Sequence, residues 1–269
     1  MIWLLFFLAI AVPLALWQWR AARLRAHRTA LLATALSPEA RGVVEGSVPL
    51  VAAMPPALRV RLEGKMTLFL DQVEFYGAGG LEVRDDMRLS IAAQACLLVA
   101  GNDAWYETLR TVVIYPAAFR SRQPVQDGYV VTEADSIRIG ESWSRGPVIL
   151  SWQDTEAGAL DDGDGKNVVF HEFAHQLDDL SGATDGIPVV GDRRAAWIEA
   201  FDDAYRRSNR LLEIGKVPFL DPYGATAPEE LFAVAVEAFF ETPRDLMSEE
   251  PEIYRELAAY FGQDPASWR

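Results

Sequence analysis

The stretch VVFHEFAHQLDD, Val168 to Asp179, places two histidines four residues apart, with a glutamate directly after the first. Residues i and i+4 of a helix lie one above the other on the same face, so His171 and His175 could hold one ion. Glu172 lies about 100° further round the helix, close enough to hold a water on the open side of that ion without ligating it. The alternative is an ordinary amphipathic surface helix with solvated His and Glu side chains, and the rest of the chain has to decide between them.

Length and composition indicate a globular protein. The chain has 269 residues and is 50% apolar, enough for one sizeable core or for one core with an appendage. Its net charge of −14, from 25 basic and 39 acidic residues, argues against direct nucleic-acid binding, because phosphates require clustered Lys and Arg. The single cysteine, Cys96, lies in the apolar run IAAQACLLVA and is predicted to be buried, which is compatible with a reducing compartment.

The N-terminus is predicted to be a membrane anchor. The run from Ile2 to Trp17 is continuously apolar apart from Pro13, and about 18 helical residues span roughly 27 Å. We therefore expect a transmembrane anchor at residues 1–19 and a basic juxtamembrane segment at 20–45, which contains Arg20, Arg23, Arg25 and Arg28. The positive-inside rule then places the protein in the inner membrane as a single-pass protein, with its catalytic domain facing the cytoplasm. A cleaved signal peptide and a peripheral, non-inserted helix are the alternatives; without insertion the protein would be cytoplasmic.

Residues 46–269 are predicted to form one catalytic domain. Strands are expected in TVVIYPAAF and GPVILSWQD, before the histidine motif, and a further short strand after the Gly79–Gly80 turn. Helices are expected after Pro55, from about Asp86, and at 192–214, 227–241 and 249–261. Because the strands cluster before the motif and the helices after it, we predict an α+β class and not an alternating parallel sheet.

The loop DDGDGKN, residues 161–167, resembles a calcium loop only superficially. It lacks the D-x-[DN]-x-[DN]-G spacing and the glutamate at the twelfth position. We instead predict a turn that ends with Asn167 as the N-cap of the motif helix.

A third metal ligand has to come from elsewhere in the chain, because a catalytic zinc site uses three protein ligands and an open position. The chain has only three histidines, and the third, His27, stands beside the predicted anchor. The metzincin pattern fails as well, since Asp178 and Ser181 occupy the positions at which it requires Gly and His. The remaining ligand should therefore be a carboxylate.

The segment TAPEELFAVAVEAFFE, residues 226–241, is apolar on nearly every side and is predicted to be a buried helix. Glu229 is expected to form a capping box with Thr226, which leaves Glu230 as the third metal ligand. Glu237 follows Glu230 by seven residues, about 20° away on the same face, and is predicted to be a buried hydrogen-bonding group beside the site. In the alternative interpretation both carboxylates lie at the rim of an exposed stripe.

Asp178 has two interpretations. It follows His171 by seven residues and His175 by three, so it lies on the histidine face of the helix. It could orient a ligand imidazole, because metal-bound histidines usually donate their other N–H to a carboxylate or carbonyl. It could equally be an ordinary polar residue at the end of a helix.

Several stretches together resemble the Mlc titration factor A (MtfA) family of zinc-dependent peptidases: HEFAHQLDDLSGATDG, DPYGATAPEELFAVAVEAFF, GGLEVRDDMRLSIAAQACLLV and GPVILSWQD. The similarity runs from about Val48 to the C-terminus. It implies a zincin-like metallopeptidase domain with an HExxH active-site helix, here preceded by one transmembrane helix that soluble family members lack. It also implies a link, in some bacteria, to a glucose-responsive repressor.

The same resemblance assigns roles to individual residues. It implies that His171, His175 and Glu230 bind one Zn²⁺ per chain, that Glu172 is the general base, and that Tyr223 faces the developing oxyanion. The implied activity is peptide-bond hydrolysis of aminopeptidase type, acting on a peptide or protein substrate.

Two other functions remain open. The first is a non-catalytic zinc-binding regulator that sequesters a transcriptional repressor, against which the presence of Glu172 argues, because a purely structural metal needs no base. The second is a metal-dependent hydrolase of non-peptide amides. For a peptidase, the strand Val148–Trp152 could align a substrate by edge pairing.

Overall fold

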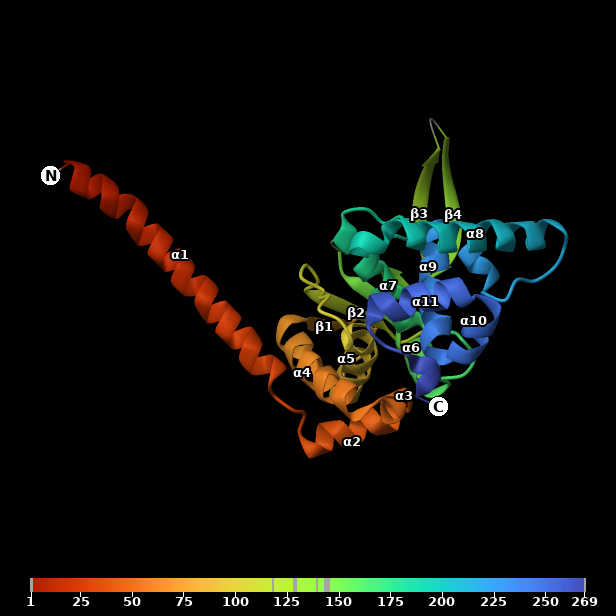
Figure 1. Ribbon diagram of the computed structural model, residues 1–269, viewed down its shortest axis with the longest axis horizontal. Helices are drawn as coiled ribbons and strands as arrows, with labels where there is room; N and C mark the ends of the chain where they lie inside the picture. The colour runs from red at the N-terminus through yellow and green to blue at the C-terminus, as the bar shows by residue number, and fades with distance from the viewer. Residues whose placement is uncertain (1, 118, 128–129, 139, 143–145, 269) are drawn as a thin grey trace.

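The computed structural model describes the backbone of residues 2–117, 119–127, 130–138, 140–142 and 146–268, and the side chains of residues 12–117 and 146–268. Most of this chain is helical (Figure 1). The α-helices are α1 (Ile2–Leu32), α2 (Pro38–Ser47), α3 (Leu50–Ala53), α4 (Pro56–Gln72), α5 (Asp85–Val99), α6 (Trp152–Leu160), α7 (Val168–Asp178), α8 (Arg194–Glu213), α9 (Pro228–Glu241), α10 (Pro243–Glu249) and α11 (Pro251–Phe261). Short 3₁₀ helices are η1 (Asp179–Ser181), η2 (Gly191–Arg193), η3 (Pro222–Ala225) and η4 (Pro265–Ser267).

The main sheet is small and mostly parallel. Its strand order is β1 (Glu74–Gly77), β2 (Thr111–Tyr115), β6 (Val148–Ser151) and β5 (Gly140–Ser142). Strands β1, β2 and β6 are parallel, and only β5 is antiparallel to its neighbour. A separate antiparallel pair, β3 (Phe119–Asp127) and β4 (Val130–Arg138), extends away from the helices in Figure 1.

The predicted α+β, zincin-like fold class is therefore wrong. Helix α5 lies between β1 and β2 in the chain, and such a connection returns the chain so that the two strands pair in parallel. The short strand expected after Gly79–Gly80 lies before that turn, as β1. The strand expected at 146–154 ends at Ser151, whose hydroxyl accepts a hydrogen bond from Asp154 N at 3.4 Å and caps helix α6.

The predicted transmembrane anchor and the inner-membrane localisation are also wrong. Among the described residues, no helix combines the length and the apolar character needed to cross a bilayer. From Val12 onward, helix α1 carries arginines at positions 20, 23, 25 and 28. A transmembrane helix requires about 20 consecutive apolar residues, and this part of α1 does not contain them. The first eleven residues of the expected anchor lie outside the described side chains.

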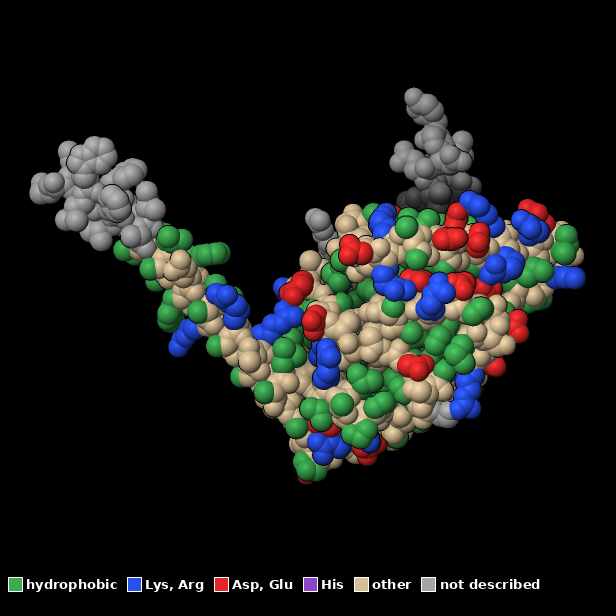
Figure 2. Space-filling view, viewed as in Figure 1, with side chains coloured by type: hydrophobic (Ala, Val, Ile, Leu, Met, Phe, Trp, Pro, Cys, Tyr) green, Lys and Arg blue, Asp and Glu red, His purple; other side chains and the backbone are tan. Residues whose placement is uncertain are grey.

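Helix α1 is attached to the rest of the protein by its C-terminal end. His27 Nε2 lies 3.0 Å from Asp71 Oδ2, and Arg28 Nη1 donates to Glu107 Oε1 at 2.7 Å. A Cβ on Gly64 of α4 would lie 2.0 Å from Leu32 O, so the glycine permits this close contact. The rest of α1 extends away from the protein, and its described part presents both hydrophobic side chains and arginines (Figures 1 and 2).

The core is formed where α4, α5, α7 and α9 pack on one another and on the sheet. The helix predicted after Pro55 is present as α4, and it directs Leu62, Met66 and Phe69 into the core. Phe173 of α7 lies 5.7 Å from Phe69 between ring centroids, so the motif helix is fixed by aromatic packing. The predicted burial of Cys96 is confirmed.

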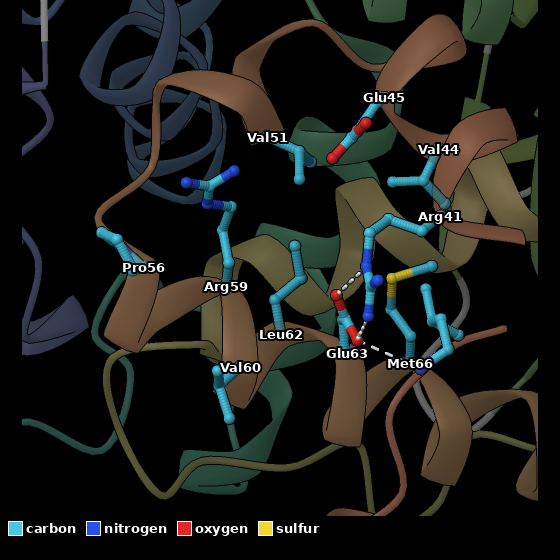
Figure 3. A pocket seen from close by; sticks show the side chains of 11 residues that line it. Arg41, Val44, Glu45, Val51, Pro56, Arg59, Val60, Leu62, Glu63 and Met66 are labelled. Atoms are coloured by element: carbon cyan, nitrogen blue, oxygen red, sulfur yellow. Dashed lines mark hydrogen bonds and ion pairs between the residues drawn. The ribbon is translucent and has the colours of Figure 1, made fainter. Parts of the chain in front are cut away.

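A cavity of about 200 Å³ lies between α2, α3 and α4 (Figure 3). Its buried apolar walls include Val44, Leu62 and Met66. Across one side, Arg41 donates from Nε and Nη2 to the two Glu63 carboxylate oxygens at 2.7 and 2.9 Å, which ties α2 to α4. None of the predicted metal ligands or catalytic residues lines this cavity.

Candidate metal centre

The motif helix α7 begins where the sequence predicts. Asn167 Oδ1 accepts hydrogen bonds from the backbone N–H groups of Val169 and Phe170, each at 3.0 Å, so Asn167 is the N-cap. The helix buries its apolar residues, and the side chains of His171 and His175 are only 15% and 13% exposed. The alternative of a solvated surface helix is therefore excluded.

Helices α7 and α9 bring three side chains to one point. His171 Nε2 lies 3.0 Å from Glu230 Oε2, and His175 Nε2 lies 3.5 Å from the same oxygen. Each residue offers one ligand atom, and these atoms lie within 4.8 Å of one another. Within the part of the chain that the structure describes, this is the group of His, Cys, Asp and Glu side chains that could hold a metal ion.

The donor set fits a divalent metal. Two imidazoles and one carboxylate are ligands that zinc accepts in catalytic sites. Burial lowers the pKa of His171, but its hydrogen bonds to Glu230 and Glu237 outweigh burial and raise the pKa to about 10. Burial raises the pKa of Glu230, but the two histidines lower it to about 2. The carboxylates around His171 therefore favour positive charge at its imidazole.

Glu237 contacts the ring nitrogen of His171 that does not face Glu230. Its Oε1 lies 2.9 Å from His171 Nδ1, and its Oε2 accepts the backbone N–H of Asn167 at 2.5 Å. The residue is 8% exposed, so the predicted buried hydrogen-bonding role is confirmed and the exposed-stripe alternative is excluded. Because Nδ1 is engaged by Glu237, Nε2 is the nitrogen of His171 that faces Glu230.

The other two candidate residues lie beside the three candidate ligands. Glu172 is 5% exposed on α7. Tyr223 stands on η3, with its ring centroid 5.9 Å from that of His171. Burial, followed by the charge of Glu230, raises the pKa of Tyr223 to about 12, so its hydroxyl is protonated at neutral pH.

The turn that carries Tyr223 is fixed on both sides. Asp221 Oδ1 accepts the backbone N–H of Tyr223 at 2.9 Å. A Cβ on Gly224 would lie 2.6 Å from Val234 Cγ2, so only glycine lets η3 pack this closely on α9.

One known protein family matches most of the chain. The family model described as "Glucose-regulated metallo-peptidase M90" matches residues 17–262. The chain belongs to this family. The family is one of metallo-peptidases, which implies a metal ion, and the group of His171, His175 and Glu230 could bind one.

Relatives support the assignment along most of the chain. Mlc titration factor A of Yersinia pestis is 31% identical over 256 residues, which cover 93% of this chain and 90% of that protein. Mlc titration factor A of Yersinia pseudotuberculosis gives the same values. An uncharacterised protein of Synechocystis sp. is 42% identical over 237 residues, which cover 86% of each chain. The predicted resemblance to the MtfA family is confirmed.

The capping box predicted for α9 is absent from this M90 chain. Pro228 occupies the first turn of the helix and Ala227 is its N-cap, without a side-chain hydrogen bond. Thr226 lies outside the helix, and its hydroxyl donates to Tyr223 O at 2.6 Å. Thr226 therefore supports the turn that carries the tyrosine, and Glu229 is an acidic residue of the first helical turn without a cap partner.

Asp178 has a role that neither interpretation anticipated. It is fully buried, and its Oδ2 accepts the backbone N–H of Gly186 at 2.7 Å. Gly186 has φ +77°, and a Cβ there would lie 2.6 Å from Pro228 O. Asp178 thus holds the loop after α7 against the first turn of α9, next to Glu230.

The strand expected to align a substrate is not at an edge. Strand β6 lies between β2 and β5, and both of its sides are paired. The prediction that Val148–Trp152 pairs with a peptide is therefore wrong, and Trp152 already belongs to α6.

Gln94 lies beside the site, although no role is predicted for it from the sequence. It is fully buried on α5, and its side chain contacts the N-cap Asn167. The sequence does indicate a buried polar contact here, because the amide of Gln94 lies inside the apolar run IAAQACLLVA and a buried amide needs a hydrogen-bond partner.

Proposed function

We propose that this chain is a zinc-dependent peptidase in which His171, His175 and Glu230 hold one Zn²⁺. The observation that carries the proposal is the convergence of these three ligand atoms within 4.8 Å, with Glu172 beside them. When bound, zinc would act as a Lewis acid and lower the pKa of a water molecule in the site to about 7.

The residues of the chain supply the proton transfers. Glu172 accepts the proton of the attacking water and passes it to the departing amine, so the carboxylate is regenerated in each cycle. The Tyr223 hydroxyl donates a hydrogen bond to the oxygen on which negative charge develops. Glu237 keeps the imidazole of His171 in one orientation through its Nδ1.

Replacement of Tyr223 by Phe should lower kcat by about 10²- to 10³-fold, the usual loss on removal of an oxyanion donor. Because the ring and the turn remain, zinc content and thermal stability should stay close to those of the wild type. Steady-state kinetics and metal analysis of the two proteins check this. A kcat within about threefold of the wild type would exclude Tyr223 from the reaction.

We further propose activity of aminopeptidase type, for which the resemblance to the MtfA family is the support. The experiment compares two peptides that differ only in an N-terminal acetyl group, with the full-length protein and mass-spectrometric detection. Stepwise loss of N-terminal residues from the free peptide alone is the expected result. Cleavage inside both peptides would instead identify an endopeptidase.

A second candidate is a regulator that binds zinc and sequesters a transcriptional repressor without catalysis. The name of the Yersinia relatives, Mlc titration factor A, favours an interaction with a regulator. The two functions differ in a measurable way, because sequestration should survive the loss of Glu172 and hydrolysis should not.

A further inference from the structure

A chain of buried hydrogen bonds runs from helix α5 to the first histidine. Asn167 Nδ2 donates to Gln94 Oε1 at 2.9 Å, and the backbone N–H of Asn167 donates to Glu237 Oε2 at 2.5 Å. The other oxygen of Glu237 lies 2.9 Å from His171 Nδ1. Gln94 is fully buried and Asn167 is 3% exposed, so water does not compete for these bonds.

Helix capping alone does not require the amide group of Asn167. A cap needs one acceptor oxygen, which serine supplies about as well as asparagine. Because Asn167 Oδ1 accepts two backbone N–H groups, its Nδ2 has to face the other way, toward Gln94 Oε1 and Gly158 O. Gln94 in turn donates through Nε2 to Ser90 at 3.3 Å, so its orientation is fixed as well.

We infer that Asn167 and Gln94 are positioning residues for the metal ligand His171. The pair holds the backbone N–H of Asn167 against Glu237, which fixes the Glu237 carboxylate on His171 Nδ1 and directs Nε2 toward Glu230 and His175. This inference rests on the proposed metal site. It adds to the site a helix, α5, that contributes no ligand.

The experiment removes the contact from each side in the full-length protein and measures zinc affinity by competition with a chelator. Asn167→Ser keeps a cap acceptor and loses the donor to Gln94, whereas Gln94→Met keeps the side-chain length and loses the acceptor. Each should weaken zinc binding by about 10- to 100-fold, the usual effect of losing an outer partner of a metal ligand. The double variant should lose no more than the more affected single variant, because both changes break the same bond between Asn167 and Gln94 and only Asn167→Ser also removes the bond to Gly158 O.

A spectroscopic measurement and a matched control separate positioning from stability. The visible spectrum of the Co²⁺-substituted Asn167→Ser protein should differ from that of the wild type. Its melting temperature should fall, because Gln94 Oε1 loses its donor, so the spectrum is compared with that of a control that also loses an amide donor. Asn102→Ser is the control, because Asn102 likewise donates to a carbonyl, Tyr260 O at 3.1 Å, and accepts from Ala104 N at 3.0 Å, but contacts no metal ligand. It should change neither the spectrum nor the zinc affinity.

Unchanged zinc affinity and an unchanged Co²⁺ spectrum in Asn167→Ser would overturn the inference and leave Asn167 as a helix cap only. Fully additive losses in the double variant would also overturn it. A wild-type protein that binds no zinc would instead refute the proposed function, so the two failures are distinguishable.

Discussion

Replacement of Glu172 by Gln should leave zinc in place and lower the hydrolysis rate by about 10²- to 10⁴-fold. The amide can still hydrogen-bond a water molecule, but it cannot accept the proton. Glu172 is 5% exposed on α7 and follows the proposed ligand His171 directly, so the nearly isosteric change disturbs little else. Metal analysis tests whether zinc is retained, and turnover of a peptide substrate by the same preparation tests whether the hydrolysis rate falls.

The matched control for Glu172→Gln is Glu199→Gln on the exposed face of α8, which should leave both metal content and turnover unchanged. Substantial turnover by metal-loaded Glu172→Gln protein would rule out Glu172 as the base. Loss of the metal would show that the glutamate supports the site in another way.

Replacement of Glu230 by Ala should release zinc, whereas the same change at Glu229 should not. Glu230 Oε2 lies within 3.5 Å of both histidines, and its loss removes one of three ligands. Zinc affinity should fall by more than the roughly 10- to 100-fold expected for an outer partner. Glu229 forms no cap, so Glu229→Ala should cost only about 0.3–1 kcal/mol of helix stability through the helix dipole.

The two variants are adjacent and chemically identical, so general damage to α9 would affect both alike. Dialysis against a weak chelator, followed by metal analysis, separates the cases. If Glu229→Ala loses zinc and Glu230→Ala retains it, the ligand assignment is wrong by one residue.

The ligand group could be predicted from the sequence because it depends on two local helices. The spacing of His171 and His175, and that of Glu230 and Glu237, fixes each pair on one face of a helix. Two carboxylates on an otherwise apolar helix need buried partners, and two histidines on another helix can provide them. The packing of α7 against α9 follows from that requirement.

The remaining features depend on longer-range or finer effects. Strands β1 and β2 pair in parallel because α5 connects them in the chain. The residue pattern within a strand does not indicate the direction of its partner strand. The capping box fails because Pro228 starts the helix one residue after the position that a Thr226 cap would require. The apolar N-terminus suggested a membrane anchor, but α1 continues through its arginines to Leu32.

The most direct test of the central claim is peptide hydrolysis by the full-length protein before chelation, after chelation, and after return of zinc. We predict one zinc per chain, loss of cleavage when the metal is removed, and recovery when one equivalent of zinc is added back. Cleavage that persists in metal-free protein, or a zinc-loaded protein that cleaves no member of a diverse peptide library, would contradict the claim.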